Sequence, residues 1–261
     1  MSVHLPDYEQ VIFDESPLEE VICQLRFNPI LKIATTPPAE FQEAVRKSFP
    51  VVTQEQGVQV ALVDGVPLLA TPRESAWQFK TPDEQWTTSL TSTFIALKTA
   101  TYQDFDHFLD RLVSVVGSFE KVYEPSFYVR VGLRYVNRFF LPREKGQPVR
   151  WQQVLNEHIA SVYGDPVLGD GIAEAKHHLV LQMSRGQLGW RYSKDSGQSE
   201  GRPTERFTLD FDHFVAGQIP CDDIVDLLRG FNDTVYRLFR WCLTDAGYQS
   251  LRPRKKPDKG G

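Results

Sequence analysis

The chain has 261 residues, of which 41% are hydrophobic and 24% are charged, and its formal net charge at pH 7 is −5. This composition is typical of a folded globular protein and argues against a mainly disordered or fibrous chain, and the acidic balance argues against a general nucleic-acid binder. No apolar run reaches the ~18–20 residues that a bilayer-spanning helix needs, and the first ten residues lack a basic segment followed by an apolar one. We therefore expect neither a membrane span nor a secretory signal. The length allows one large domain or two small ones, at roughly 100–200 residues per domain.

The cysteines indicate a reducing compartment. Cys23, Cys221 and Cys242 are three in number, so they cannot all pair within one chain. Cys23 and Cys242 fall among apolar neighbours, which predicts buried, reduced thiols in a cytoplasmic protein. Cys221 stands at the start of a predicted helix, where it is either a residue of the cap region or a thiol whose pKa the helix dipole lowers.

The first half of the chain begins with an irregular segment, residues 1–18. Residues 19–27 then alternate apolar and polar side chains, which is typical of a strand with one buried face. A helix is expected at about 38–48, with Thr36 as its capping residue and Pro37 at its first position.

Several strand-like segments and a long helix follow. VQVALVDG and PLLATP are joined by a turn signal at Asp64-Gly65, and ESAWQFKT and QWTTSLTSTFIALKT flank residues 82–84, so we expect an antiparallel meander. The next helix should begin with a capping box between Thr101 and Asp104. Its apolar stripe should lie across a sheet. The stripe comprises Phe105, Phe108, Leu109, Leu112, Val115, Val116, Phe119 and Val122.

The order of elements then begins again. Residues 127–140 give the strongest strand pattern in the chain, with apolar side chains on one face and arginines on the other. A helix is expected at about 151–162, followed by a hairpin of HHLVLQMS and QLGWRYSKD and by a strand, ERFTLDFDHF. The last predicted element is a long helix with one apolar stripe. That stripe comprises Ile224, Leu227, Leu228, Phe231, Val235, Leu238, Phe239 and Cys242.

Both halves thus read as a strand, a short helix, three or four antiparallel strands and a long helix. Residues 25–27 (Leu-Arg-Phe) match residues 133–135 (Leu-Arg-Tyr), and the even offset of 108 residues superposes the apolar and polar faces. We therefore predict an α+β fold made by tandem duplication of a β-α-β(3-4)-α unit, with repeats at 19–124 and 125–246. The two copies would form a curved antiparallel sheet with the long helices on one face. A coincidental match in an ordinary α+β chain is the alternative.

The element order is similar to that of TATA-binding-protein-like and helix-grip folds, in which a curved antiparallel sheet wraps a long C-terminal helix. This likeness is topological and identifies no functional residues. Three stretches, PLEEVICQLRF, FIALKTATYQDFDHFLDRL and RVGLRYVNRFFLP, also resemble signature segments of a sporadically distributed, uncharacterised family of prokaryotic proteins of about this length. Members of that family often lie in accessory or defence-like gene neighbourhoods, so the resemblance implies a setting and not a reaction.

A row of arginines is the first candidate binding feature. Arg130, Arg134 and Arg138 alternate along one face of the strand at 127–140, and Arg26 should lie near them if the duplication is real. Guanidinium groups suit phosphates, carboxylates and nucleic-acid backbones.

Asp210, Asp212 and His213, on the predicted strand ERFTLDFDHF, complete the candidate site. The two carboxylates lie on the polar side of that strand, where pairing with the arginines would stabilise the sheet by a few tenths to ~1 kcal/mol. Alternatively, the arginines stay available to an anion or a partner. The helices should cover only the apolar face, which leaves the polar face either exposed to solvent or reserved for a partner.

The sequence carries no signature of catalysis or of a metal site. It contains no phosphate loop or H-E-x-x-H, so we assign no catalytic residue and no cofactor. A strand would point the adjacent His177 and His178 to opposite faces, and Asp210, Asp212 and His213 lack the spacing of a zinc or iron motif. Whether the protein is an enzyme stays open, and a non-enzymatic role is favoured.

Residues 247–261 predict a basic, flexible tail. Its candidate contact residues are Arg252, Arg254, Lys255 and Lys256. The tail is either a solubilising end or a contact to phosphate or to an acidic partner.

Three functions follow from these features. The first is a non-catalytic binding protein of a prokaryotic defence or toxin–antitoxin-like system, whose polar sheet face binds a protein, such as the product of a neighbouring gene. The second is a small-ligand receptor or enzyme with a pocket between the sheet and a long helix. The third is nucleic-acid binding through the arginine face and the basic tail, against which the overall acidity argues. We expect no membrane contact, and homo-oligomerisation is left open.

Overall fold

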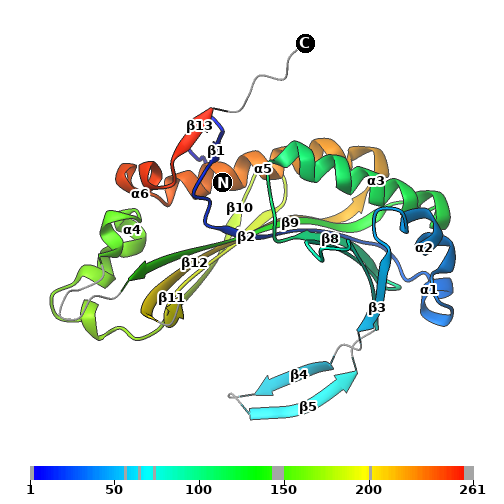
Figure 1. Ribbon diagram of the computed structural model, residues 1–261, viewed down its shortest axis with the longest axis horizontal. Helices are drawn as coiled ribbons and strands as arrows, with labels where there is room; N and C mark the ends of the chain where they lie inside the picture. The colour runs from blue at the N-terminus through cyan, green and yellow to red at the C-terminus, as the bar shows by residue number, and fades with distance from the viewer. Residues whose placement is uncertain are drawn as a thin grey trace. The chain divides into compact units, whose positions relative to one another are not determined.

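The computed structural model describes residues 3–55, 58–63, 66–72, 75–142, 150–199 and 202–255 (Figure 1). Its helices are α1 (Leu31–Thr35), α2 (Ala39–Val45), α3 (Phe105–Tyr123), α4 (Glu157–Ala160), α5 (Ile224–Trp241) and α6 (Asp245–Ser250), with short 3-10 helices at Trp151–Gln153, Ser161–Gly164, Gly169–Gly171 and Cys221–Asp223. Its strands are β1 (Val11–Phe13), β2 (Leu18–Arg26), β3 (Val51–Glu55), β4 (Val58–Val63), β5 (Val66–Pro72), β6 (Ala76–Lys80), β7 (Trp86–Leu90), β8 (Phe94–Thr99), β9 (Tyr128–Pro142), β10 (Ala175–Gln182), β11 (Gln187–Ser199), β12 (Arg202–Ile219) and β13 (Pro253–Lys255). The α+β class is as the sequence predicts.

Most strands belong to one large antiparallel sheet, in the order β10-β11-β12-β9-β2-β8-β7-β6-β3. Two small sheets pair β1 with β13 and β4 with β5. The chain also divides into two compact units. Unit 1 consists of Met1–Val21, Leu133–Val215 and Asp226–Gly261, and unit 2 consists of Ile22–Gly132 and Ala216–Val225.

In unit 2 the long helix α3 packs on the strands through aromatic rings. The ring of Phe119 lies 4.7 Å from that of Phe27, which follows β2, and Phe108 stacks on Trp86 of β7 at 5.9 Å. The buried residues of α3 are those of the predicted stripe except Val122, which is half-buried. The amphipathic period therefore placed this helix correctly, and burial of its apolar stripe holds it on the strands.

The start of α3 differs from the prediction. The capping residue is Asp104 and not Thr101, because the Oδ1 atom of Asp104 accepts a hydrogen bond from the His107 amide at 2.8 Å. The helix begins at Phe105, directly after that cap.

The predicted helix at 38–48 is shorter, and another helix precedes it. The hydroxyl of Thr36 donates to the Lys32 carbonyl at the end of α1, at 2.7 Å, so it does not cap α2. Helix α2 starts after Pro38 without a side-chain cap, and Pro37 lies outside it. The short strand β3 was not predicted, because most of its side chains are exposed and show no alternation.

In unit 1 the long helix α5 packs on β9. The hydroxyl of Tyr135 donates to Asn232 Oδ1 of α5 at 2.8 Å, and the rings of Phe139 and Phe239 stack at 6.4 Å. Helix α5 spans Ile224–Trp241, and the face of β9 that carries Tyr135 and Phe139 is the one that α5 covers.

The predicted continuous helix at 151–162 is wrong. This segment forms a 3-10 turn, then α4, then a second 3-10 turn. Leu155 forms an isolated antiparallel bridge with Leu243, and the Asn156 amide donates to the Cys242 carbonyl at 2.8 Å. The backbone at this point therefore pairs with the segment after α5, which interrupts the helix.

The two end segments are more regular than predicted. Residues 1–18 contain β1, and residues 247–255 of the predicted tail contain the end of α6 and strand β13, which pairs with β1. Ion pairs accompany this pairing. They are Arg252–Glu15, Arg254–Asp14 and Lys255–Glu9. A flexible tail from residue 247 is therefore wrong as far as residue 255, because its basic side chains face the acidic segment near the start of the chain; Lys256 lies outside the described residues.

Candidate functional site

Alternation along β9 points its arginines away from α5. Tyr135 contacts α5, so Arg134 and Arg138 face the other side of the strand. The same face continues through β12 and β11, where Asp210 lies directly opposite Arg191. We call this surface of unit 1 the polar face. It comprises Glu19, Arg134, Arg138, Arg191, Asp195, Arg206, Asp210 and Asp212.

Asp210 is the centre of the polar face. Its two carboxylate oxygens accept hydrogen bonds from Arg134 Nε at 2.7 Å and Nη2 at 2.8 Å, which is a bidentate pair. Arg191 Nη1 lies 3.4 Å from Asp210 Oδ2. The Asp210 side chain is 9% exposed, whereas those of Arg134 and Arg191 are 41% and 46% exposed. The hydrogen bonds to Asp210 raise the pKa of Arg134. The buried carboxylate thus lies between two half-exposed cations.

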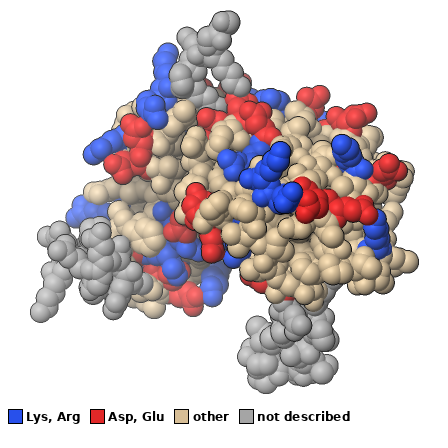
Figure 2. All heavy atoms as spheres, turned by 45° about the vertical axis from the view of Figure 1, so that its right-hand side comes forward, with Lys and Arg blue, Asp and Glu red and all other residues tan. Residues whose placement is uncertain are grey.

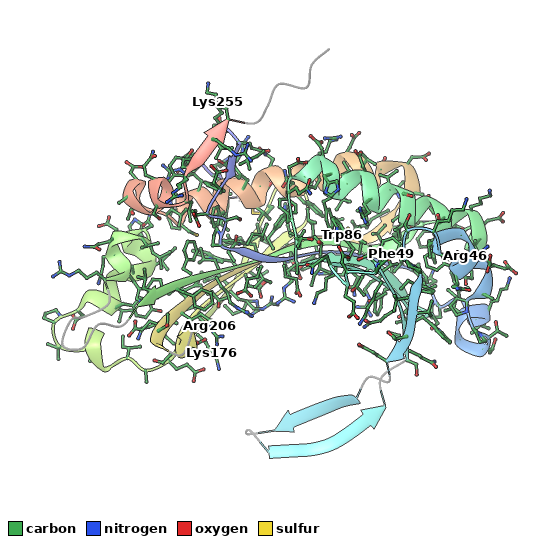
Figure 3. All side chains as sticks on the ribbon, in the orientation of Figure 1. Arg46, Phe49, Trp86, Lys176, Arg206 and Lys255 are labelled. Carbon is green, nitrogen blue, oxygen red and sulfur yellow. The ribbon has the colours of Figure 1, made fainter. Side chains whose placement is uncertain are left out.

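The remaining arginines of the polar face also have carboxylate partners. Arg138 donates to Glu19, and Arg206 Nε donates to Asp195 Oδ1 at 2.8 Å. Figure 3 shows Arg206 on the side of β11 and β12 away from α5, and Lys176 of β10 on the same side. Of the two interpretations left open by the sequence, mutual pairing is therefore the one observed in unit 1.

The three arginines of the predicted row and the nearby Arg26 are divided between the units. Arg130 and Arg26 belong to unit 2, where Arg130 Nη1 lies 3.5 Å from Gln24 Oε1 and Arg26 is exposed. Asp212 belongs to unit 1, and its charge adds to that of Asp210 in raising the pKa of Arg134.

The grouping of His213 with the two aspartates is wrong. His213 is 2% exposed and faces α5, where its ring stacks on Phe231 with centroids 4.0 Å apart. Its Nε2 atom lies 3.0 Å from the Arg185 carbonyl oxygen, and its Nδ1 atom is buried without a partner in the described structure. Residue 213 is an odd number of positions from 210 and 212, so the alternation of a strand points its side chain to the opposite face. This alternation alone would have separated the imidazole from the two carboxylates.

Burial of His213 makes unfolding pH-dependent. Desolvation lowers the pKa of His213 below its ordinary 6.5, although the Arg185 carbonyl and the Asp212 charge oppose this shift. The His213 imidazole therefore binds a proton more weakly in the folded chain than in the unfolded chain. We expect the free energy of unfolding to fall as the pH drops below about 6.5. Urea unfolding at about pH 7.5 and about pH 5.5 measures this change in the free energy of unfolding. The variant His213→Phe should lose less stability than the wild type over this range, and equal losses would contradict the assignment.

Residues that the sequence analysis missed complete the polar face. Arg191 and Asp195 lie on the same face of β11, and Arg206 of β12 lies directly opposite Asp195. The alternation of QLGWRYSKD could have identified Arg191 and Asp195. Their partners depend on the order of strands in the sheet, which the sequence does not specify.

A buried ion pair lies on the other face of the same strands. Lys194 Nζ is 3.2 Å from Glu205 Oε1, and the two side chains are only 5% and 8% exposed. Lys194 also donates to the Ile172 carbonyl at 2.6 Å, and Trp151 Nε1 donates to Glu205 Oε2 at 2.9 Å. The pair thus ties the segment between β9 and β10 to the strands β11 and β12.

The thiols are poorly suited to nucleophilic chemistry. Burial raises the pKa of Cys221 to about 11, and the nearby Glu120 adds to this. Burial also raises the pKa of Cys23 and of Cys242 well above the ordinary range. The dipole of the following helix therefore does not activate Cys221.

Within the described ranges, no three His, Cys, Asp or Glu side chains are grouped so that they could hold a metal ion. The search for helices in the same residues found none long and apolar enough to cross a membrane. On the side visible in Figure 2, basic and acidic side chains are interspersed and neither sign forms one broad patch. Comparison with known protein-family models and with curated proteins finds no match for this chain.

Proposed function

We propose that this is a non-catalytic binding protein that docks a protein partner on the polar face of unit 1. The observation that carries this proposal is the row of half-exposed ion pairs centred on Asp210, on the side of the strands that α5 does not cover. Such a surface offers fixed donors and acceptors of both signs, which suits the polar rim and anchors of a protein interface.

The ion pairs favour a protein over a nucleic acid as the partner. A phosphate backbone is held by cations that release counterions on binding. In the polar face each arginine already contacts a carboxylate, although Arg134 and Arg191 share Asp210, and these carboxylates would repel phosphates. A partner that presents both an acidic and a basic side chain meets complementary groups in this row.

We further propose that the chain arose by the tandem duplication of a β-α-β(3-4)-α unit, with repeats at 19–124 and 125–246. The order of the large sheet supports this. Counted outward from the neighbours β9 and β2, it runs β9, β12, β11, β10 in one direction and β2, β8, β7, β6, β3 in the other, so the two directions correspond except for the additional edge strand β3. Two fused copies of one unit would give this mirrored order. The order also supports the likeness to TATA-binding-protein-like folds, with the long helices α3 and α5 at equivalent places.

The family resemblance supplies the biological setting for this proposal. The first partner to test is the product of the gene next to this one, within a cytoplasmic prokaryotic defence or toxin–antitoxin-like system. The buried thiols Cys23 and Cys242 support a reducing compartment, because neither is paired.

The test is capture of the neighbouring gene product by the purified protein, followed by measurement of the dissociation constant of that pair. The double variant Arg134→Met with Asp210→Asn removes the central pair without leaving a buried charge. We expect it to weaken binding by about tenfold or more, because fully desolvated charge pairs at interfaces carry coupling energies above 1 kcal/mol.

The matched control is Arg46→Met with Glu43→Gln, which removes an exposed ion pair of 2.9 Å at the C-terminal end of α2 in unit 2. It should leave the dissociation constant unchanged. Equal affinities of the wild type and the Arg134/Asp210 variant would remove the polar face from the interface. Tight binding of an oligonucleotide that weakens steeply with salt would instead assign the surface to nucleic acid.

A further inference from the structure

Unit 2 carries two adjacent hollows that share Arg111 and His107 as lining residues. The first has a volume of about 420 Å3, lies between the end of α2 and the side of α3, and also includes Phe49 and Asp110. The second has a volume of about 490 Å3, lies between the β6–β7 turn and the start of α3, and includes Asp83. Each volume is in the range of about 300–1,000 Å3 that is usual for small-molecule sites.

Arg111 differs from the arginines of the polar face. Its guanidinium carbon lies 4.5 Å from the centre of the Trp86 ring, and the side chain is half-buried. Among the described residues, no carboxylate or carbonyl accepts a hydrogen bond from it. Figure 3 shows Trp86 beneath α3. A fork of N–H donors is thus held against an aromatic ring and left without an acceptor.

His107 presents a second group without a partner in the same place. Its ring meets Trp86 edge-on, with centroids 5.5 Å apart and planes at 85°. Its Nδ1 atom is buried and has no hydrogen-bond partner in the described structure. One aromatic ring therefore contacts both side chains, so the Arg111 guanidinium is held in place before a ligand binds.

Two carboxylates limit what this site can bind. Asp83 lines one hollow and Asp110 the other. The carboxylate of Asp83 accepts hydrogen bonds from the Thr81 hydroxyl at 2.5 Å and the Gln85 amide at 3.2 Å, and these lower its pKa. Asp83 is therefore charged at neutral pH, and its negative charge lies beside the positive charge of Arg111.

We infer that these hollows bind a small zwitterion of the amino-acid class, with its carboxylate on Arg111 and its ammonium group toward Asp83 or Asp110. The guanidinium fork matches a carboxylate in geometry and charge. The flanking aspartates would repel a phosphate dianion or a polyphosphate and attract an ammonium group. This site is separate from the polar face of unit 1, and it does not depend on the function proposed there.

The experiment uses the full-length protein and the twenty common amino acids as probes, one at a time, with binding measured by calorimetry. We expect at least one of them to bind in a 1:1 ratio. The N-acetyl and the carboxamide forms of that amino acid, which lack the ammonium and the carboxylate charge respectively, should each bind about tenfold or more weakly.

Arg111→Met should weaken binding by about tenfold or more, and Arg111→Lys should weaken it less. The control is Arg46→Met, which removes the same charge from unit 2 at an exposed site outside both hollows and should leave binding unchanged. Because loss of the contact with Trp86 could also unfold the region, Asp83→Asn and Asp110→Asn form a second test. At least one of these two variants should weaken binding of the amino acid more than it weakens binding of the N-acetyl form.

The proposal is overturned if none of the twenty amino acids binds the wild type at concentrations up to about 10 mM, which corresponds to a binding free energy weaker than about −3 kcal/mol. It is also overturned if inorganic phosphate or the N-acetyl form binds as tightly as the amino acid. Binding that survives Arg111→Met in a folded variant would place the ligand elsewhere. None of these outcomes changes the expectation for partner capture by the polar face.

Discussion

Glu205→Gln should lower the free energy of unfolding by about 3–5 kcal/mol, because it leaves the charge of Lys194 buried without a counter-charge. The wild-type pair is 3.2 Å apart, and both side chains are less than one tenth exposed. Glutamine retains an oxygen for the bond from Trp151 Nε1, so the loss reflects the charge and not this hydrogen bond. Urea unfolding followed by circular dichroism measures the effect.

Two controls identify the burial of the pair as the cause. Glu174→Gln removes one partner of the exposed pair Lys176–Glu174, whose side chains are 74% and 59% exposed, and should cost less than about 1 kcal/mol. The double variant Lys194→Met with Glu205→Met should be more stable than Glu205→Gln, because it buries no charge. A double variant no more stable than the single one would show that the ion pair is not what the substitution damages.

Phe119→Ala should lower the free energy of unfolding by about 3–5 kcal/mol, since it removes a large, fully buried side chain from the core of unit 2. Phe119 has 0% relative exposure. Its ring lies 4.7 Å from Phe27, 5.3 Å from Tyr123 and 6.5 Å from Phe41. The cavity would therefore open between α3, α2 and the end of β2. Thermal and urea unfolding both report the loss.

Val113→Ala is the matched control for this helix. Val113 lies on the same α3 but is 48% exposed, so its truncation should change stability by no more than about 0.5 kcal/mol. Similar losses for the two variants would mean that α3 is held by its own helical propensity and not by its buried stripe. The comparison thus tests the assignment of faces that the sequence pattern made.

The long elements could be predicted because their periodicity is local. The apolar residues of α3 recur every three to four positions. In β9, the neighbouring residues Arg134 and Tyr135 point to opposite faces of the strand, and this does not depend on the surrounding tertiary structure. The short elements could not be predicted in the same way. Strands β1 and β13 have three residues each and exist because they pair with each other.

The candidate site was predicted in part. The sequence singled out Arg134, Arg138, Asp210 and Asp212, all of which lie on the polar face of unit 1. It wrongly added His213, although the same alternation rule assigns that residue to the face of α5. It overlooked Arg111, because a single arginine on an amphipathic helix is typical of a solvated face, and its stacking on Trp86 requires β7 to lie beneath α3.

The amino-acid sequence alone determined which side of the long elements α3 and β9 is buried, because a side chain's direction follows from the φ and ψ angles of its own segment. Only the tertiary structure decided which charges meet. Arg134 and Asp210 are 76 residues apart, and Trp151 and Glu205 are 54 apart, so their contacts depend on which strands become neighbours and where the intervening segments return. The same reason explains the ends of the chain, where a segment that reads as a free basic tail becomes a strand because its partner lies about 240 residues earlier.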